Sequence, residues 1–230
     1  MKKILLSVAA LSMLFGATVF TSCKKDTNTT APTITLNGAN PYTVILGATY
    51  TDPGAKATDN AGNDITSSIT TTVTATNPNM AIAASYTITY NVTDANGNVA
   101  TPVTRTVYVT IVANTLLGHW GIVDVTDTTV DYNDVLTDGT VNPTTTLYTA
   151  QFGDYPSAAV YFVLSGNSGT VITVPQQQVT CGTDLIARTF TGSGTVNTDG
   201  SGFKINYTVV DSAGTVTGTD TYSGKTRVRK

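Results

Sequence analysis

The chain contains few of the side chains that usually carry out enzymatic chemistry. His119 is the single histidine among 230 residues, so any Ser-His-Asp or Cys-His arrangement would have to be built on it. The sequence has no Gly-x-Ser-x-Gly nucleophile motif, and it cannot supply the three or four cysteine and histidine ligands that zinc needs. Two aspartates would suffice for glycoside hydrolysis, but nothing marks a pair in which one pKa is raised. We therefore expect no enzymatic activity and no cofactor.

Aspartate is the most frequent potential metal ligand, since all 15 acidic residues are aspartates. Five of them fall within 15 residues: Asp124, Asp127, Asp131, Asp134 and Asp138. Oxygen ligands on loops suit calcium, but this spacing is not the Asp-x-Asp-x-Asp-Gly of a calcium loop. Solvent-facing aspartates on strand edges and turns are the simpler interpretation. We therefore assign no metal ligands and keep calcium as the alternative.

Aromatic residues suggest a binding surface. Tyr148, Phe152, Tyr155 and Tyr161 gather around the turn-rich segment 151–157, between two expected strands. Rings on such a connection could stack on a sugar or a peptide. We therefore take Phe152, Tyr155 and Tyr148 as the candidate ligand-binding residues. The alternative is that these rings fill the core.

The N-terminal residues have the pattern of a targeting signal. Lys2 and Lys3 precede an apolar run over residues 4–20, which ends in Thr21-Ser22-Cys23. A charged start, a short hydrophobic segment and a cleavage site are typical of a signal peptide, and here they resemble the lipobox of bacterial lipoproteins. The resemblance implies that residues 1–22 are removed, that Cys23 carries lipid, and that residues 23–31 form a flexible tether.

Composition limits the partners and the fold class. The formal net charge is −3, and loss of Lys2 and Lys3 makes it more negative, so nucleic acid is excluded as a partner. Threonine, valine, glycine and asparagine are frequent while good helix formers are scarce, which favours an all-β protein. Cys181 has no second cysteine to pair with once Cys23 is lipidated, and we expect it to be a buried thiol.

The first half of the mature chain predicts a β-sandwich. Alternating apolar runs lie at residues 33–36, 42–46, 69–75, 86–93 and 103–112. The segment Asp94-Ala-Asn-Gly-Asn98 between the last two fits a tight hairpin better than a metal loop, because no glutamate follows. The segments 32–38, 47–59 and 86–98, with the core Tyr50-Thr-Asp-Pro-Gly54, resemble a bacterial immunoglobulin-like domain family of surface proteins. The resemblance covers residues 32–112 and implies an accessory domain, residues 32–113, that spaces or presents other domains.

The second half, residues 114–230, predicts a further β-rich domain. Expected strands are 120–125, 147–152, 159–164, 170–174, 186–190, 203–210 and 226–228, joined by connections rich in glycine, asparagine, aspartate and serine. This number of strands fits a second small β-sandwich or a closed barrel. Gly118-His-Trp120 resembles the Gly-x-Trp that begins lipocalin-like barrels. Other segments, such as 172–179, resemble uncharacterised β-rich C-terminal modules of lipoproteins.

These observations together indicate a lipid-anchored protein of the cell envelope without enzymatic activity. Lys24 stands where lipoproteins retained at the inner membrane commonly have aspartate, so we expect the outer membrane, on its periplasmic face or at the cell surface. The favoured role is that of a glycan- or nutrient-binding accessory lipoprotein. The alternatives are an adhesion or structural protein that contacts envelope proteins, and a lipocalin-like carrier of a small ligand.

The lipoprotein assignment predicts the outcome of a substitution at Cys23. Cys23→Ser should abolish lipidation, because acylation requires the thiol and no other cysteine lies near the cleavage region. The variant should therefore leave the membrane fraction in a carbonate wash that retains the wild type. A variant retained at the wild-type level would contradict the lipoprotein assignment.

Overall fold

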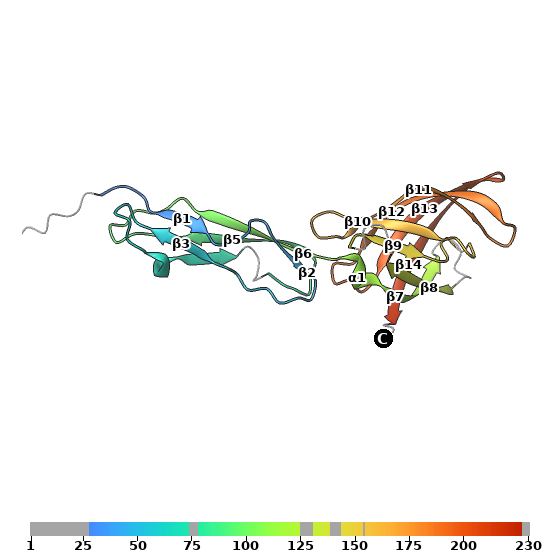
Figure 1. Ribbon diagram of the computed structural model, residues 1–230, viewed down its shortest axis with the longest axis horizontal. Coiled ribbons are helices and arrows are strands. Elements are labelled where there is room, and N and C mark those ends of the chain that lie inside the picture. The colour runs from blue at the N-terminus through green and yellow to red at the C-terminus, as the bar shows by residue number, and fades with distance from the viewer. Residues whose placement is uncertain (1–27, 74–77, 125–130, 139–143, 154, 227–230) are drawn as a thin grey trace, which may run out of the picture.

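The computed structural model describes residues 28–73, 78–124, 131–138, 144–153 and 155–226. The signal peptide and Cys23 therefore lie outside the described residues. The described chain is nearly all β and forms two bodies placed end to end, the N-terminal one in blue and green and the C-terminal one in yellow-green to red (Figure 1). Among the described residues, no helix has the length and apolar character needed to cross a membrane.

The N-terminal body is an immunoglobulin-like sandwich. A four-stranded sheet has the order β2-β6-β5-β4, with β2 parallel to β6 and the other pairs antiparallel; a two-stranded sheet pairs β1 with β3. The elements are β1 (Thr33–Leu36), β2 (Tyr42–Ile45), β3 (Ala55–Thr58), the 3-10 helix η1 (Thr66–Ser68), β4 (Thr70–Val73), β5 (Ala84–Asn91) and β6 (Val103–Thr110). All five predicted strands are present. The short strand β3 was not expected from the sequence.

A buried arginine organises one end of this sandwich. Arg105 is fully buried among the apolar residues of the core, and its Nε lies 3.1 Å from Asp52 Oδ1. Its Nη2 donates to the backbone oxygens of Asn37 and Gly54 at 2.6 and 2.9 Å, and Tyr90 Oη donates to Asp52 Oδ2 at 2.6 Å. A buried charge is tolerated when it is paired and hydrogen-bonded. The Asp-Pro-Gly motif supplies both kinds of partner to Arg105, the carboxylate of Asp52 and the carbonyl oxygen of Gly54.

The C-terminal body is a closed antiparallel barrel of eight strands, each paired with the next and the last paired with the first. It begins after a short helix. The elements are α1 (Ala113–Leu116), β7 (Gly118–Asp124), β8 (Asp131–Asp138), β9 (Thr146–Thr149), β10 (Val160–Ser165), β11 (Val171–Cys181), β12 (Ile186–Val196), β13 (Phe203–Asp211) and β14 (Gly214–Thr226). Of the two architectures left open by the sequence, the lipocalin-like barrel is confirmed.

Aromatic rings fill the barrel. Inward-facing positions alternate along each strand, and they place Trp120, Phe162, Phe190, Phe203 and Tyr222 in one buried cluster. Phe203 stacks on Tyr222 with centroids 4.1 Å apart, and Trp120 meets Phe203 edge to face at 5.2 Å. Trp120 Nε1 also donates to the carbonyl oxygen of Leu116, 2.8 Å away, which fixes α1 against the barrel. The barrel is therefore a packed core in the described residues.

Several strands of the barrel differ from the prediction. Strand β8 was not among the expected strands, and it pairs with β7 over six residues. The expected strand 147–152 ends at Thr149. Of the expected strand 226–228, Thr226 is the last residue of the long β14, and residues 227 and 228 lie outside the described residues. Long-range pairing decides these cases, since it supplies backbone hydrogen bonds to segments whose side chains alternate poorly.

The two bodies are in contact. Hairpin 166–170 and hairpin 197–202 of the barrel meet the end of the sandwich. Ile111 N donates to Ser168 O at 2.9 Å, and Ala83 N donates to Thr198 O at 2.6 Å. Ala83 and Ile111 belong to the buried cluster of the barrel, and Leu46 packs against it. Whether residues 32–113 also fold alone stays a prediction.

This contact predicts the effect of an added methyl group. A Cβ at Gly169 would lie 1.9 Å from Ile111 O, whereas at Gly166 in the same hairpin its nearest neighbour would be a Val171 methyl at 3.6 Å. Both glycines have left-handed backbones, with φ of 65° and 81°. We expect Gly166→Ala to lower the free energy of unfolding by about 1 kcal/mol through backbone strain. Gly169→Ala should cost about 2 kcal/mol more, because the contact between the bodies must open. Urea unfolding measures both values, and equal losses would mean that the contact contributes nothing.

Candidate functional site

The predicted aromatic site lies at the end of the barrel away from the sandwich. Strand direction fixes this placement, because hairpins 166–170 and 197–202 occupy the end that contacts the sandwich, and the connection 150–159 joins the opposite ends of β9 and β10. We call the latter end the far end. Residues 150–153 and 155–159 of this connection lie across it and meet the hairpin between β11 and β12, where Gly182 N donates to Pro156 O at 2.8 Å.

Phe152 points into the barrel. Its side chain is fully buried, with ring centroids 6.0 Å from Phe190 and 5.2 Å from Tyr207. The expectation that this ring is exposed for stacking is therefore wrong. The physical reason is closure: without Phe152, the rings of Phe190 and Tyr207 would face water at the far end. Gly153, with φ of 61°, turns the chain back after the insertion.

Tyr155 covers a buried arginine. Its half-buried ring meets Phe190 edge to face at 5.8 Å, and Arg188 Cζ lies 4.6 Å from its centroid. The Arg188 guanidinium pairs with Asp184 at 2.5 Å and with Asp211 at 3.4 Å, and its hydrogen bond to Asp184 lowers the pKa of that carboxyl to about 2. Tyr155 therefore closes the far end through a cation–π contact. Sequence reasoning missed Arg188, because no pattern marks an inward-facing arginine at a strand end.

Two buried carboxylates hold the connection in place. Asp134 is 2% exposed and accepts hydrogen bonds from Thr149 Oγ1, Ala150 N and Val135 N, the last at 2.7 Å. Burial raises its pKa. Asp220, which is fully buried, accepts from Gly153 N at 3.1 Å. These carboxylates satisfy backbone groups that the insertion of Phe152 takes out of water.

The expected solvent-facing aspartates are thus wrong for Asp134. Asp138 is exposed at the end of β8, the side chains of Asp124 and Asp131 are not described, and Asp127 lies outside the described residues. Within the described ranges, no three acidic, histidine or cysteine side chains group as metal ligands would. In the other segment, Asp94 accepts from Asn96 N and Asn98 N at 2.9 and 2.8 Å, as in a hairpin turn.

Of the two remaining reactive side chains, Cys181 neighbours this site, since Arg188 Nη1 donates to the carbonyl oxygen of Cys181 at 2.6 Å. His119 is exposed on β7, opposite Val135 of β8. Cys181 is buried, as expected, and burial raises the pKa of its thiol, which makes it a poor nucleophile.

Tyr148 lies on the outer wall of the barrel, and its partner there is Tyr161. The two residues are opposite each other in β9 and β10, and their half-buried rings are 5.7 Å apart with an interplanar angle of 34°. The Gln177 side chain fixes the backbone of Tyr161: it accepts from the Tyr161 backbone nitrogen at 3.0 Å and donates to the Tyr161 carbonyl oxygen at 2.8 Å. Thr137 of β8, which is exposed, lies opposite Tyr148 on its other side. We call Tyr148 and Tyr161 the tyrosine platform. Of the predicted binding residues, only Tyr148 belongs to it.

The different placements of Phe152 and Tyr155 predict different costs of truncation. Phe152→Ala should lower the free energy of unfolding by about 3 to 5 kcal/mol, as truncation of a buried phenylalanine usually does. Tyr155→Ala should cost about 1 to 2 kcal/mol, since its ring is half-buried and loses one cation–π contact. Chemical denaturation of both variants measures the difference. Equal, small losses would place the Phe152 ring outside the core.

The chain was compared with known proteins. No curated protein matches it. Three solved structures align with it at low similarity. A lipoprotein of Bacteroides thetaiotaomicron is 18% identical, with 84% of this chain and 100% of that chain covered and a TM-score of 0.35. A candidate outer membrane protein of Bacteroides fragilis is 14% identical, with 85% and 87% covered and a TM-score of 0.33. A structure of Clostridium perfringens ZmpB, described as a carbohydrate-binding-module domain (CBM51-2) in complex with GlcNAc together with INT domains, is 19% identical, with 77% and 29% covered and a TM-score of 0.29.

The family comparison concerns the N-terminal body. The family described as "Bacterial surface protein, Ig-like domain" matches residues 34–109, which run from β1 through β6. The expected resemblance, placed at residues 32–112 from the sequence, is thereby confirmed. Residues 34–109 therefore form a domain of the bacterial surface protein Ig-like family.

Proposed function

We propose that this chain is a non-enzymatic lipoprotein of the outer membrane that binds a glycan on the wall of its barrel. The observation that carries the proposal is the tyrosine platform. Two half-exposed rings lie side by side on paired strands, and Gln177 fixes the backbone of Tyr161. They offer a preformed apolar surface that carries their phenolic hydroxyl groups. Sugar rings present C–H faces and hydroxyl edges, so they match a surface of this kind.

The arrangement of the two bodies supports a role at the envelope. Asn98 Nδ2 donates to Asn28 O, so the described chain begins beside the β5–β6 hairpin, at the end of the sandwich opposite the barrel (Figure 1). A lipid on Cys23 would therefore place the sandwich next to the membrane and the barrel farther out. The family of residues 34–109, described by its occurrence in bacterial surface proteins, supports the same location.

The barrel interior supports the wall as the binding surface. A carrier of a small apolar ligand would need the space that Phe162, Phe190 and Phe203 occupy. The acids that the fold buries in the barrel, Asp134 and Asp220, bind the connection 150–159 and so serve closure in this arrangement. Both points favour binding on the outer wall over transport and over catalysis.

The test compares tyrosines at matched exposure. Titration of the full chain in detergent against a panel of oligosaccharides should find a ligand whose Kd rises about tenfold or more in Tyr148→Ala and in Tyr161→Ala, which corresponds to about 1.4 kcal/mol. Tyr108→Ala is the control, because Tyr108 is a half-buried tyrosine on β6 of the sandwich. All three variants should keep melting temperatures within a few degrees of the wild type, since half-exposed rings contribute modestly to packing.

The opposite result has a defined meaning. If the folded wild type binds no oligosaccharide of the panel, or if the platform variants bind as tightly as Tyr108→Ala, the glycan proposal fails. Recovery of a specific envelope protein by cross-linking on intact cells would then favour the adhesion or structural alternative.

A further inference from the structure

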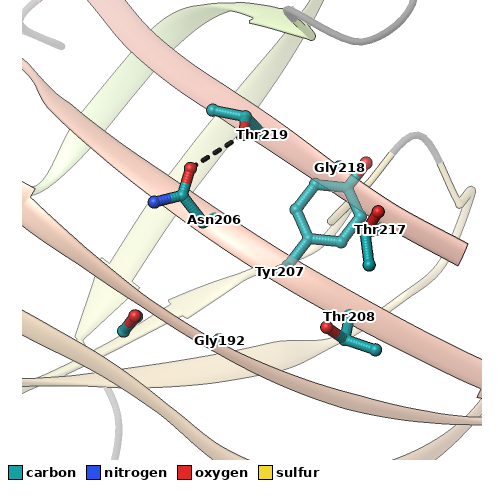
Figure 2. A pocket seen from close by; sticks show the side chains of 8 residues that line it. Gly192, Asn206, Tyr207, Thr208, Thr217, Gly218 and Thr219 are labelled. Atoms are coloured by element: carbon teal, nitrogen blue, oxygen red, sulfur yellow. Dashed lines mark hydrogen bonds between the residues drawn. The ribbon is translucent and has the colours of Figure 1, made fainter.

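A second candidate site lies on the other side of the barrel from the tyrosine platform. Strands β12, β13 and β14 are two to four strands away from β9 and β10 around the closed sheet. Their wall contains an open hollow of about 410 Å³ (Figure 2). This volume lies within the range of small-ligand sites in proteins, roughly 300 to 1,000 Å³.

Two glycines shape the hollow. Gly192 of β12 and Gly218 of β14 lie opposite Tyr207 of β13, one on each side. A Cβ at Gly218 would lie 2.2 Å from Tyr207 Oη, and a Cβ at Gly192 would lie 2.6 Å from the backbone carbonyl oxygen of Asn206. Neither position has room for a side chain, so the wall at these points consists of backbone and the Tyr207 ring, which lies toward Gly218 (Figure 2).

The rest of the lining is polar and lies on the outer face. Asn206 and Thr219 are opposite each other, and Thr219 Oγ1 donates to Asn206 Oδ1 at 2.8 Å. This bond orients the amide so that its nitrogen points away from Thr219 (Figure 2). Ser193, Thr208 and Thr217 add three hydroxyl groups, each of which can donate and accept.

The lining carries no formal charge. All eight lining residues are uncharged, and Lys204, two positions before Asn206 on the same face of β13, does not line the hollow. A charged ligand would lose hydration here without gaining an ionic partner. A ligand rich in hydroxyl groups would exchange hydrogen bonds to water for hydrogen bonds to the amide, hydroxyl and backbone groups.

We propose that this hollow is a binding site for a neutral, polyhydroxylated ligand, of the size of one or two sugar residues. It goes beyond the platform, because it uses different strands and a different set of side chains. A glycan chain bound at one site and a neutral sugar bound at the other would give the barrel two contacts with polysaccharide.

The experiment locates the site directly. The full chain in detergent is titrated with maltohexaose, cellohexaose, mannohexaose and xylohexaose, and hexagalacturonate serves as the acidic counterpart. With at least one neutral probe, the amide NMR signals of Ser193, Asn206 and Thr217 should shift. Asn206→Ala should raise the Kd of that probe about fivefold or more, while Thr215→Ala, on an exposed position of β14 outside the hollow, should not change it.

Two results would overturn the proposal. One is the absence of shifts at the hollow with every neutral probe. The other is tighter binding of hexagalacturonate that is lost in Lys204→Gln, which would assign the wall to an anionic ligand. Loss of binding in the Tyr148→Ala variant with unchanged shifts at the hollow would separate the two sites, so that the failure of one proposal does not decide the other.

Discussion

A closed barrel of eight strands has an interior about as wide as the side chains that must fill it, and both of its ends must be covered. In this protein the interior is filled by large rings, from Trp120 near the sandwich to Phe190 near the far end. The two ends are covered in different ways. The sandwich and α1 cover one, where Ile111 and Ala83 join the core of the barrel, and the connection 150–159 covers the other.

The charged groups inside the barrel follow from this requirement. A connection that folds over the end of a barrel takes backbone nitrogens out of water, and each needs an acceptor. Asp134 and Asp220 provide acceptors for Ala150 and Gly153. Arg188 then lies under Tyr155, paired with acids of two neighbouring hairpins. The sequence associates the aspartates of residues 124–138 with calcium or with a solvated surface. One of them, Asp134, instead holds the backbone of the connection 150–159 in place.

The sequence predicted what depends on local pattern. Alternation located the five predicted strands of the sandwich to within a few residues, and Asn96-Gly97 located its hairpin, where Gly97 has φ of 88°. Closure is not local. Strand β8 is recognisable through its pairing with β7, since its residues include Asp134 on the inner face. Phe152 lies in the turn-rich segment 151–157, and side chains in such segments are usually exposed. Its ring points inward because it covers the rings of Phe190 and Tyr207. Arg105 and Arg188 were missed for a related reason: each pairs with an acid that is distant in the sequence, Asp52 and Asp211 respectively.

These constraints also decide where a ligand can be held. Inward positions of the barrel are occupied by the core, one end is occupied by the sandwich, and the far end is sealed by Phe152 and Tyr155. The side chains at outward positions of the strands are not needed to fill the core, because only every second side chain of a strand points inward. Tyr148 and Tyr161 on one side, and Asn206 with its neighbouring hydroxyls on the other, both lie at outward positions held by strand pairing. Rigid strands position such groups more accurately than a loop does, so a search for the function of this barrel begins on its wall.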